Sequence, residues 1–521
     1  MPIALDQLPD DVDALKSLVA DQLVRNKQLT TENQHYKAQV LTLTEQLNLA
    51  LARRYAASSE KLSPDQIRLF DEAEAESEAA SAVDVDDDVI IVPAHKRKKR
   101  GRKPLPDNLP RIDVVHEIPE SARYCDHDGQ LLVEIGEVIS EQLDIIPAKI
   151  QVIRHVRKKY ACNCGKTIKT APLPAQPIPK SMASPGLLAH ITVSKYQDAL
   201  PLYRQETILQ RIGVDIPRAT LANWMIQAGT LIQPLINLMQ DRLLAYDIIQ
   251  MDETTVQVLR EDGKAAQSKS YLWLQRGGPP EQPVVLYDYD PGRGAGVPTR
   301  LLAGFTGYLQ TDGYDGYNAV VVNNKLMHVG CMAHARRKFS EAVKAQGKKK
   351  KESKAYRGLA LIQKLYRVEK QARKLDPEDR HARRQQQARP VLDELRAWLN
   401  ESLPQVPPTS ATGKALNYLH NEWSKLVRYL DDGRLEIDNN GAENAIRPFV
   451  VGRKNWLFSA SVKGVKASAN LYSLIETAKA NSLEPYAYLR YLFTELPKAE
   501  TVEAIEALLP GNLSKDQIRI G

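Results

Sequence analysis

DIIQMDETTVQVL (residues 247–259) is an apolar run that contains two carboxylates, Asp252 and Glu253. Its Ile, Val and Thr residues predict a β-strand. A carboxylate within a buried strand is costly unless it binds a cation or a hydrogen-bond donor. We therefore interpret this stretch as a strand of a catalytic core, and Asp252 as a candidate metal ligand.

Further strands follow the first one along the chain. SYLWLQR (270–276) and PVVLYDYD (283–290) have the same strand character, and GYLQTDGYDGYNAV (307–320) predicts a strand that ends at Asp312. Two acids on neighbouring strands would form an oxygen-rich site suited to Mg²⁺. For either acid taken alone, the alternative that it merely caps a turn stays open.

The segment LMHVGC (326–331) predicts the next strand, and MAHARRKFSEA after it predicts a helix. His328, Cys331 and His334 have a spacing that metal ligands can have. We prefer the simpler interpretation of a strand end that enters a helix. Basic side chains then lie near the active face, namely Arg336, Arg337 and Lys338.

A third candidate acid lies in IDNNGAENAIRPFVVGRKNWLFSASVKGVKAS (437–468). Asp438, Asn439 or Asn440 can cap a helix that carries Glu443 about one turn in. Glu443 is preferred over Glu436, which precedes the cap, and over Asp438, which we expect to serve as the N-cap. A carboxylate among Arg, Lys and Asn residues is typical of sites where phosphates meet metal ions. The candidate phosphate contacts here are Arg447, Arg453 and Lys454.

Helical segments flank and interrupt the predicted sheet. Within 184–240, residues 200–229 predict a helix, a break at Gly213 and a second helix from about Pro217. The pair could be a helix-turn-helix that faces DNA, or an ordinary helical hairpin that caps the next domain. Residues of about 347–430 predict an α-helical insertion within a catalytic domain of 246–470. The candidate DNA contacts of the helix-turn-helix are Arg218, Thr220 and Asn223.

The N-terminal region predicts an interaction segment rather than a core. Residues 8–56 carry apolar residues at alternating steps of three and four, the a/d rhythm of a coiled coil that self-associates, although a single helix docked on its own domain is the alternative. Residues 57–94 predict a short helix and an acidic linker. Residues 95–111 form a basic arm suited to a DNA groove, and its basic residues are Lys96, Arg97, Lys98, Lys99, Arg100, Arg102 and Lys103.

A small β-rich module is predicted over residues 112–175. The strands are expected at 138–146 and 150–162, with Pro147 and Ala148 in the turn. Two clusters of candidate zinc ligands flank this hairpin, and they contain Cys125, His127, Cys162 and Cys164. Their spacing departs from that of a regular zinc ribbon, so a module without zinc stays open as well.

Composition is that of a folded, multidomain chain. The 521 residues are 43% hydrophobic and 26% charged, with a net charge of +7, and contain only four cysteines. Sparse cysteine usage argues against a disulfide scaffold and for a reducing compartment. The N-terminus has no signal-peptide pattern and no apolar run is long enough for a membrane span. We expect a cytoplasmic protein.

Several separated motifs resemble the insertion-sequence-66 family of transposases, the TnpC-type DDE enzymes. They are SSEKLSPDQIRLFDEAE, RKKRGRKPLP, KYAC, SKYQDALPLYRQE, MDET, TDGYDGYN, GCMAHARRKF and NNGAENAIRPFVVGRKNWLF. The resemblance covers nearly the whole chain, including a C-terminal helical segment over 471–521. It departs in the finger, where family members usually have two Cys-x-x-Cys pairs, whereas here Asp128 replaces one Cys and the second pair is shortened.

The resemblance implies a leucine-zipper-like N-terminus, a zinc-finger-like module and a ribonuclease-H-like α/β core with a helical insertion. It maps the catalytic acids onto Asp252, Asp312 and Glu443, which would hold two Mg²⁺ ions. The implied activity is cleavage and strand transfer of an insertion sequence. The implied partners are the terminal repeats and target DNA, a second copy of the chain, and helper proteins of the same element. The implied location is the cytoplasm of a bacterial cell, with the protein at the nucleoid when it is bound to DNA.

Two rival functions are compatible with the same residues. One is a DNA-binding regulator built from the coiled coil, the basic arm and the helix-turn-helix, with an inactive core. The other is a structure-specific nuclease that hydrolyses DNA with the same metal site and never joins ends. Nothing in the sequence resembles a phosphate-binding loop of ATPases, so ATP is not expected.

Overall fold

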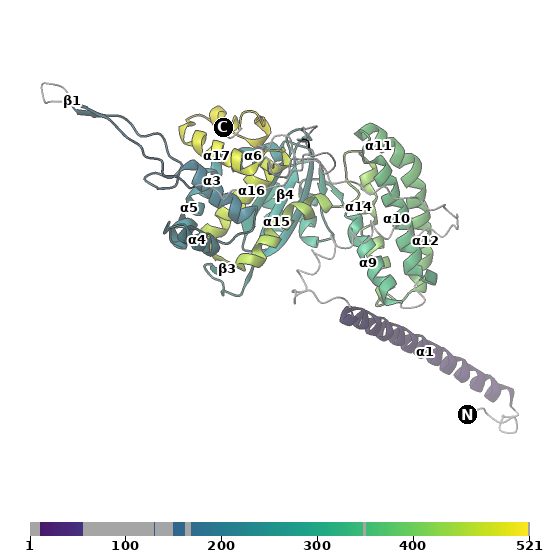
Figure 1. Ribbon diagram of the computed structural model, residues 1–521. Coiled ribbons are helices and arrows are strands. Elements are labelled where there is room, and N and C mark those ends of the chain that lie inside the picture. Colours follow the sequence, from purple (N-terminus) through teal and green to yellow (C-terminus); the bar gives the residue numbers. More distant parts are fainter. Residues whose placement is uncertain (1–10, 56–129, 131–149, 162–167, 347–350, 519–521) are drawn as a thin grey trace. The chain divides into compact units, whose positions relative to one another are not determined.

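A computed structural model describes residues 11–55, 130, 150–161, 168–346 and 351–518 (Figure 1). The chain divides into two compact units, one of residues 73–173 and one that combines residues 1–72 with 174–521. The larger unit contains the sheet, the helical insertion and the N-terminal helix. Among the residues that the structure describes, no helix is long and apolar enough to cross a membrane.

A mixed sheet forms the centre of the larger unit, and its strand order is β5-β4-β3-β6-β7. Strands β3, β4 and β5 make an antiparallel meander, whereas β6 and β7 run parallel to β3. A short strand, β8 (Ser459–Ser461), which the sequence did not predict, pairs with the far end of β3. The five main strands are β3 (Ile248–Arg260), β4 (Lys269–Gly277), β5 (Val284–Asp290), β6 (Tyr308–Gln310) and β7 (Met327–Val329).

The predicted strands are therefore present, and most of their ends differ by one or two residues from the expected ones. Strand β6 ends at Gln310, two residues before the predicted end, so that Asp312 follows the strand instead of ending it. Two short helices, α7 (Gly296–Leu301) and α8 (Asn318–Asn323), lie in the connections that make β6 and β7 parallel to β3.

A glycine fixes the point where β3 and β6 begin. Gly307 has a φ of +131°, and a Cβ placed there would lie 2.4 Å from the carbonyl oxygen of Asp247. The backbone N–H of Tyr308 donates to that same carbonyl at 2.8 Å. Only glycine combines this backbone conformation with so close an approach.

Two helices that follow the insertion pack on the sheet. Helix α15 (Asn440–Trp456) contacts β3 and β4, and α16 (Val462–Ala480) contacts β5. Trp273, Phe449 and Tyr472 are buried in the core that they share with the strands. Phe449 and Tyr472 meet edge to face, with ring centroids 5.6 Å apart.

Helix α16 also closes the outer edge of β5. The backbone N–H groups of Tyr287 and Val285 donate to the Ser473 and Thr477 hydroxyls at 2.7 and 3.0 Å, and the Asn481 amide donates to the Pro283 carbonyl at 2.9 Å. Four residues of a helix advance about 6.0 Å along its axis, and two residues of a strand advance about 6.6 Å. Helix side chains spaced four residues apart can therefore bond to every second residue of the strand. An otherwise open strand edge is thereby satisfied.

Helices predicted for residues 184–240 precede the sheet. They are α3 (Pro185–Tyr196), α4 (Leu202–Arg211), α5 (Arg218–Leu231) and α6 (Gln233–Leu244). Helices α4 and α5 are separated by a turn in which Gly213 has a positive φ, as the predicted pair requires. The C-terminal segment is also helical, and its α17 (Pro485–Glu495) packs against α3.

The insertion is a helical bundle with a hydrophobic core of its own (Figure 1). Helix α9 (Met332–Ala345) belongs to this bundle, although it precedes the predicted start of the insertion at about residue 347. Phe339 of α9 packs against Trp398 of α12 (Arg389–Ser402), with ring centroids 5.9 Å apart. A π-helical turn, Arg384–Ala388, joins α11 to α12. The helices are α9 (Met332–Ala345), α10 (Lys354–Ala372), α11 (Pro377–Arg383), α12 (Arg389–Ser402), α13 (Ala411–Asn421) and α14 (Trp423–Leu426).

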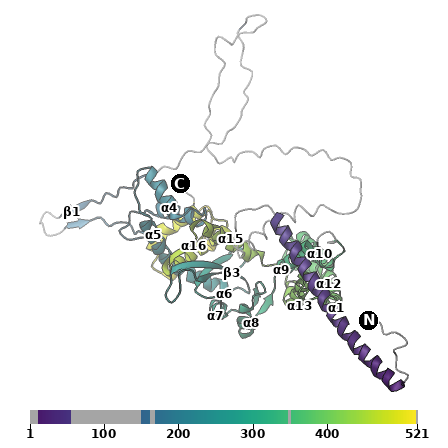
Figure 2. The ribbon, with the colours of Figure 1, turned by 90° about the horizontal axis from the view of Figure 1, so that it is seen from below.

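The C-terminal part of the N-terminal helix α1 (Val12–Tyr55) contacts the insertion (Figure 2). Glu45 is only 4% exposed there, and its carboxylate accepts hydrogen bonds from the Gln346 side chain at 2.9 Å and the Ala411 N–H at 2.7 Å. Most large apolar side chains of α1 remain exposed, among them Val12, Val19, Leu29, Tyr36, Val40, Leu43 and Leu47.

The smaller unit contains a short antiparallel pair, β1 (Lys159–Ala161) and β2 (Ile168–Thr170). The prediction of a strand over 150–162 is wrong for residues 150–158, which have no regular structure and are exposed, so no buried face sustains the alternating pattern. The candidate zinc ligands and the basic arm of residues 95–111 lie outside the described residues.

Candidate active site

The register of β3 and β6 places the first two candidate acids side by side. Gln250 pairs with Gln310, and Asp252 and Asp312 each follow two residues later. Side chains two residues apart on a strand share a face. The Gln250 amide donates to the Gln310 side-chain oxygen at 2.9 Å, so these two side chains do meet on one face. The acids continue this row beyond the last paired residues.

The charges of the other two candidate acids act on Asp252. Burial raises the pKa of Asp252 well above its ordinary value, and the carboxylates of Glu253, Glu443 and Asp312 raise it further. One Asp252 oxygen accepts the backbone N–H of Glu253 at 2.8 Å, which opposes that rise. Carboxylates that repel one another in a partly buried place form a site that a divalent cation would stabilise.

The neighbouring acid, Glu253, has a different environment. Its side chain is 3% exposed and pairs with Arg293, whose Nε donates to it at 2.8 Å, while the Tyr317 hydroxyl donates to the other oxygen at 2.6 Å. Burial and the nearby Asp312 carboxylate raise the pKa of Glu253, and Tyr317 and Arg293 oppose this effect. Because Glu253 already has these two donors within the fold, Asp252 is favoured over Glu253 as the candidate metal ligand.

Glu443 lies in the first turn of α15 and is 7% exposed. Its Oε1 atom is buried and has no hydrogen-bond partner among the described residues. A buried carboxylate oxygen without a donor is costly, so this atom fits a ligand that the protein itself does not supply.

The two competing acids of this region both have partners. Asp438 accepts the Tyr366 hydroxyl at 2.9 Å, and burial raises its pKa to about 6. Glu436 accepts the Gln250 amide at 3.4 Å and lies 3.9 Å from the Arg276 guanidinium. These contacts favour Glu443 over both as the acid that faces the shared site.

The start of α15 is held directly against β3. The Asn439 amide donates to the carbonyl of Met251, the residue before Asp252, at 2.8 Å. Asn439 occupies the N-cap position, so the prediction that Asp438 is the N-cap residue is wrong by one position. Asp438 still accepts the N–H of Asn440, the first helical residue, at 3.2 Å. The Asn439 side chain makes no capping hydrogen bond to its own helix and bonds to the strand instead.

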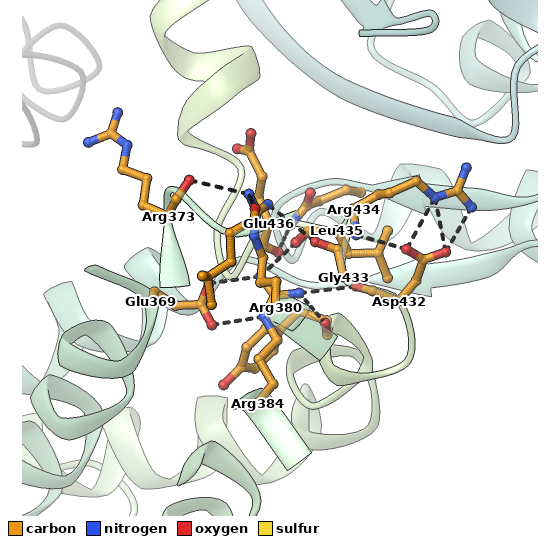
Figure 3. Close-up of polar contacts among 12 residues, drawn as sticks. Glu369, Arg373, Arg380, Arg384, Asp432, Gly433, Arg434, Leu435 and Glu436 are labelled. Atoms are coloured by element: carbon orange, nitrogen blue, oxygen red, sulfur yellow. Dashed lines mark hydrogen bonds and ion pairs between the residues drawn. The ribbon is translucent and has the colours of Figure 1, made fainter. Parts of the chain in front are cut away.

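The segment that leads into α15 is anchored by the insertion (Figure 3). Arg384, which is 1% exposed, donates to the carbonyl oxygens of Tyr429, Asp432 and Leu435 at 2.9–3.0 Å. The same guanidinium forms a two-point ion pair with Glu369 at 2.7 and 2.9 Å. Arg384 thereby fixes the backbone that returns from the helical bundle to the start of α15, which carries Glu443.

Cys331 and His334, at the start of α9, lie beside Glu443. One possible ligand atom from each of the three residues lies within 4.8 Å of the others. His328 is not part of this group, because its Nε2 lies 2.8 Å from the Thr311 hydroxyl. Sequence reasoning treated Cys331 and His334 as the entrance to a helix and missed their contact with Glu443. The only signal in the sequence was their three-residue spacing.

The predicted DNA contacts occupy different environments. Arg447 lies one turn beyond Glu443, and its Nε is buried with no hydrogen-bond partner among the described residues. Arg453 is 9% exposed and donates to the Thr255 hydroxyl of β3 at 3.1 Å, which holds α15 to the sheet. Lys454 is half-buried, whereas Arg218 and Asn223 are exposed at the start of α5.

A comparison with known protein families matches residues 180–467 to the family described as Transposase IS66. The chain belongs to this family. Other parts of the transposase match the IS66 C-terminal element (residues 473–510), the zinc-finger binding domain of transposase IS66 (122–165) and a domain described as Transposase C of IS166 homeodomain (42–114).

Relatives of this transposase occur in Sinorhizobium fredii (strain NBRC 101917 / NGR234). The uncharacterized protein y4qI is 33% identical over 549 residues, which covers 99% of both chains. The uncharacterized protein y4jD is 36% identical over 433 residues, which covers 80% of this chain and 82% of the relative. The match to y4qI therefore extends through the sheet, the insertion and the C-terminal helices.

Proposed function

We propose that this IS66-family transposase cleaves and joins DNA strands with Asp252, Asp312 and Glu443, which would hold two Mg²⁺ ions. The observation that carries the proposal is the register of β3 and β6, in which Asp252 and Asp312 each lie two residues beyond the paired Gln250 and Gln310. The buried Oε1 of Glu443, which has no hydrogen-bond partner among the described residues, and the raised pKa of Asp252, to which Glu253, Glu443 and Asp312 contribute, support it. The acids come from positions far apart in the sequence, so the fold itself assembles them. Membership of the transposase family supports DNA as the substrate.

The proposed class of core is ribonuclease-H-like. A meander of three antiparallel strands, extended by two strands parallel to β3, supports this assignment. The acids also lie where such a core can use them, since Asp252 is on the central strand and Asp312 follows the strand beside it. Helix α15 then brings Glu443 to the same place.

The chemistry of the donor atoms fits Mg²⁺, because carboxylate oxygens are its usual protein ligands. Bound Mg²⁺ supplies an activated water or 3′-OH and stabilises the oxygen that leaves phosphorus. Asp252 would present its carboxylate from the central strand, and Asp312 from the segment that follows β6. Glu443 contributes a longer side chain from the rigid first turn of α15.

Positive charge near Glu443 would orient the DNA backbone. Arg447 lies four residues beyond it and therefore on the same side of α15. Its buried Nε, which has no partner among the described residues, suits a phosphate oxygen. This residue would position the scissile phosphate without taking part in bond making.

DNA binding away from the acids is assigned to three segments. The basic arm of residues 95–111 would neutralise phosphates, and α4 with α5 would form a helix-turn-helix that presents Arg218 and Asn223. The zinc-finger match over residues 122–165 supports a third contact. In that module Cys125, His127, Cys162 and Cys164 are the proposed zinc ligands.

Self-association is assigned to α1. With 3.6 residues per turn, Glu45 lies about 200° around the helix axis from Leu43, so the heptad seam faces away from the contact with the insertion. The exposure of Leu29, Val40, Leu43 and Leu47 supports a second copy of α1 as the partner of this seam. A dimer would hold both ends of the element together.

The proposal is tested by a matched pair of substitutions on adjacent residues. Asp252→Asn should abolish Mg²⁺-dependent cleavage of DNA that contains the element ends, while end binding in a gel-shift assay stays near that of the unmodified protein. Glu253→Gln is the control, and it should lose stability but retain cleavage, because Glu253 is bound by Arg293 and Tyr317.

Two outcomes would replace the proposal by a rival. Sequence-specific binding without any cleavage by the unmodified protein would favour a DNA-binding regulator with an inactive core. Cleavage without joining of pre-cut ends to target DNA would favour a structure-specific nuclease. Equal cleavage by Asp252→Asn and the unmodified protein would remove Asp252 from the site.

A further inference from the structure

The side of Glu443 that faces the insertion contains a nitrogen ligand that the Asp-Asp-Glu assignment does not use. His334 Nδ1 lies 3.8 Å from Glu443 Oε1. Both atoms are buried, and neither has a hydrogen-bond partner among the described residues. An unsatisfied buried polar atom costs about 1–3 kcal/mol, so two of them that face each other call for an explanation.

The separation of the two atoms distinguishes between a direct contact and a shared ligand. A distance of 3.8 Å is too long for a hydrogen bond between nitrogen and oxygen. Two atoms that each lie about 2.0–2.2 Å from one ion are separated by roughly 3–4 Å, depending on the angle at the ion. The observed spacing therefore fits two ligands of one ion better than it fits a hydrogen-bonded pair.

The two ligand-bearing helix starts are also fixed to each other. The N–H of Met332, the first residue of α9, donates to the Ile437 carbonyl at 3.1 Å. The N–H of Asn439 donates to the Cys331 sulfur at 3.2 Å. His334 and Glu443 therefore project from two helix starts that are joined by one backbone hydrogen bond and one hydrogen bond from a backbone N–H to a cysteine sulfur, a rigid arrangement of the kind that metal sites need.

We propose that His334 is a ligand of the same ion that Glu443 holds. This inference rests on the proposed function, because Glu443 is a metal ligand only there. A site with an imidazole nitrogen suits first-row transition ions, whereas Mg²⁺ prefers oxygen ligands. The half of the two-metal site that contains His334 therefore binds Mn²⁺ more tightly than Mg²⁺.

Cys331 is assigned a positioning role rather than a ligand role for this ion. Its sulfur already accepts the Asn439 N–H, and that bond ties the start of α15 to the end of the β7 segment. Thiolate ligands select softer ions than Mn²⁺ or Mg²⁺. Cys331→Ser should accordingly leave the number and type of Mn²⁺ ligands unchanged.

The test is the binding of Mn²⁺ alone to the full-length protein without DNA. Electron spin-echo spectroscopy of bound Mn²⁺ reports a directly coordinated nitrogen. We expect a nitrogen signal that disappears in His334→Ala, together with a loss of Mn²⁺ affinity of about tenfold or more. Mg²⁺ affinity, measured by competition, should fall much less.

Matched variants separate this ion from other sites in the chain. His420, which is exposed on α13, is the control, and His420→Ala should keep both the nitrogen signal and the affinity. Glu443→Gln should remove the same signal as His334→Ala, because the two residues share the ion. If His334→Ala does not fold, as judged by its circular dichroism, His334→Gln provides the comparison.

The outcomes distinguish the inference from the proposed function. Mn²⁺ that binds through Asp252 but shows no nitrogen coupling, or an unchanged signal in His334→Ala, would overturn the role of His334 and leave the proposed function standing. If neither Mn²⁺ nor Mg²⁺ binds in a way that Asp252→Asn weakens, the proposed function itself fails.

Discussion

Asp252 and Glu253 are adjacent in the sequence, yet their side chains have different partners. Successive residues of a strand point to opposite faces, and only Glu253 pairs with Arg293 and Tyr317, although the charge of Asp312 raises the pKa of both acids. The sequence could single out Asp252 and Asp312 as candidates, because acids within or directly after apolar strands are unusual. It could not predict the partners of Glu253, which come from connections with no recognisable pattern.

Asp438 provides a test of electrostatics at the residue scale. Its pKa is raised from 3.8 to about 6 by burial, so the folded protein retains its proton more strongly than the unfolded chain does. Its contribution to stability is therefore most favourable below about pH 4 and is lost as the pH rises through about 6. Asp438→Asn should remove this loss and stabilise the protein by up to about 3 kcal/mol at pH 7.5 relative to pH 4.

The measurement is urea unfolding of both proteins at the two pH values. The difference in unfolding free energy between Asp438→Asn and the unmodified protein should grow with pH. A difference that stays constant between pH 4 and pH 7.5 would contradict the raised pKa of Asp438. Cleavage activity is not needed for this comparison.

At the scale of elements, strands were easier to predict than their environment. Apolar-rich runs located β3, β4 and β5, whereas β8 is too short to have a pattern of its own. The sequence also did not predict that α16 covers the edge of β5, because Ser473 and Thr477 have no feature that distinguishes them from other helical residues. Tertiary contacts, not local propensity, decide such features.

The insertion was predicted as helical, but its connection to the site was not. Arg384 appears in the sequence as one more basic residue in a charged helix. In the fold it is almost fully buried, and it holds the segment before α15 through three carbonyl oxygens and Glu369. The helical bundle is thus built into the support of Glu443.

Arg384→Met should therefore destabilise the protein by about 3–5 kcal/mol, because it leaves the Glu369 carboxylate and three carbonyls without their donor. The control is Lys364→Ala, which breaks the exposed Lys364–Glu394 pair and should cost less than about 1 kcal/mol. Chemical unfolding of the three proteins provides the comparison. Equal destabilisation by the two substitutions would contradict the anchoring role of Arg384.

At the scale of the whole molecule, α1 carries the proposed assembly function. The heptad rhythm was visible in the sequence, and the helix over Val12–Tyr55 agrees with it. What the sequence could not indicate is the contact through Glu45, since a single buried carboxylate on a charged helix has no pattern. This contact occupies one side of α1 and leaves the seam available.

Leu29→Asp combined with Leu43→Asp should convert the assembled protein into a monomer, because both charges would be buried in the seam. Thr31→Asp combined with Gln34→Asp is the control, since it adds the same charge to exposed positions away from the seam. Light scattering coupled to size exclusion measures the mass. An unchanged mass for the leucine variant would exclude the seam as the interface.

Glu443 rather than Glu436 is proposed as the third catalytic acid, and a cleavage assay of two matched variants distinguishes these residues. Glu443→Gln keeps the shape of the side chain and removes its charge, so it should retain end binding and lose Mg²⁺-dependent strand cleavage. Glu436→Gln should cleave within about tenfold of the unmodified protein, which corresponds to roughly 1.4 kcal/mol of barrier. Cleavage by Glu443→Gln together with loss of cleavage by Glu436→Gln would contradict the assignment.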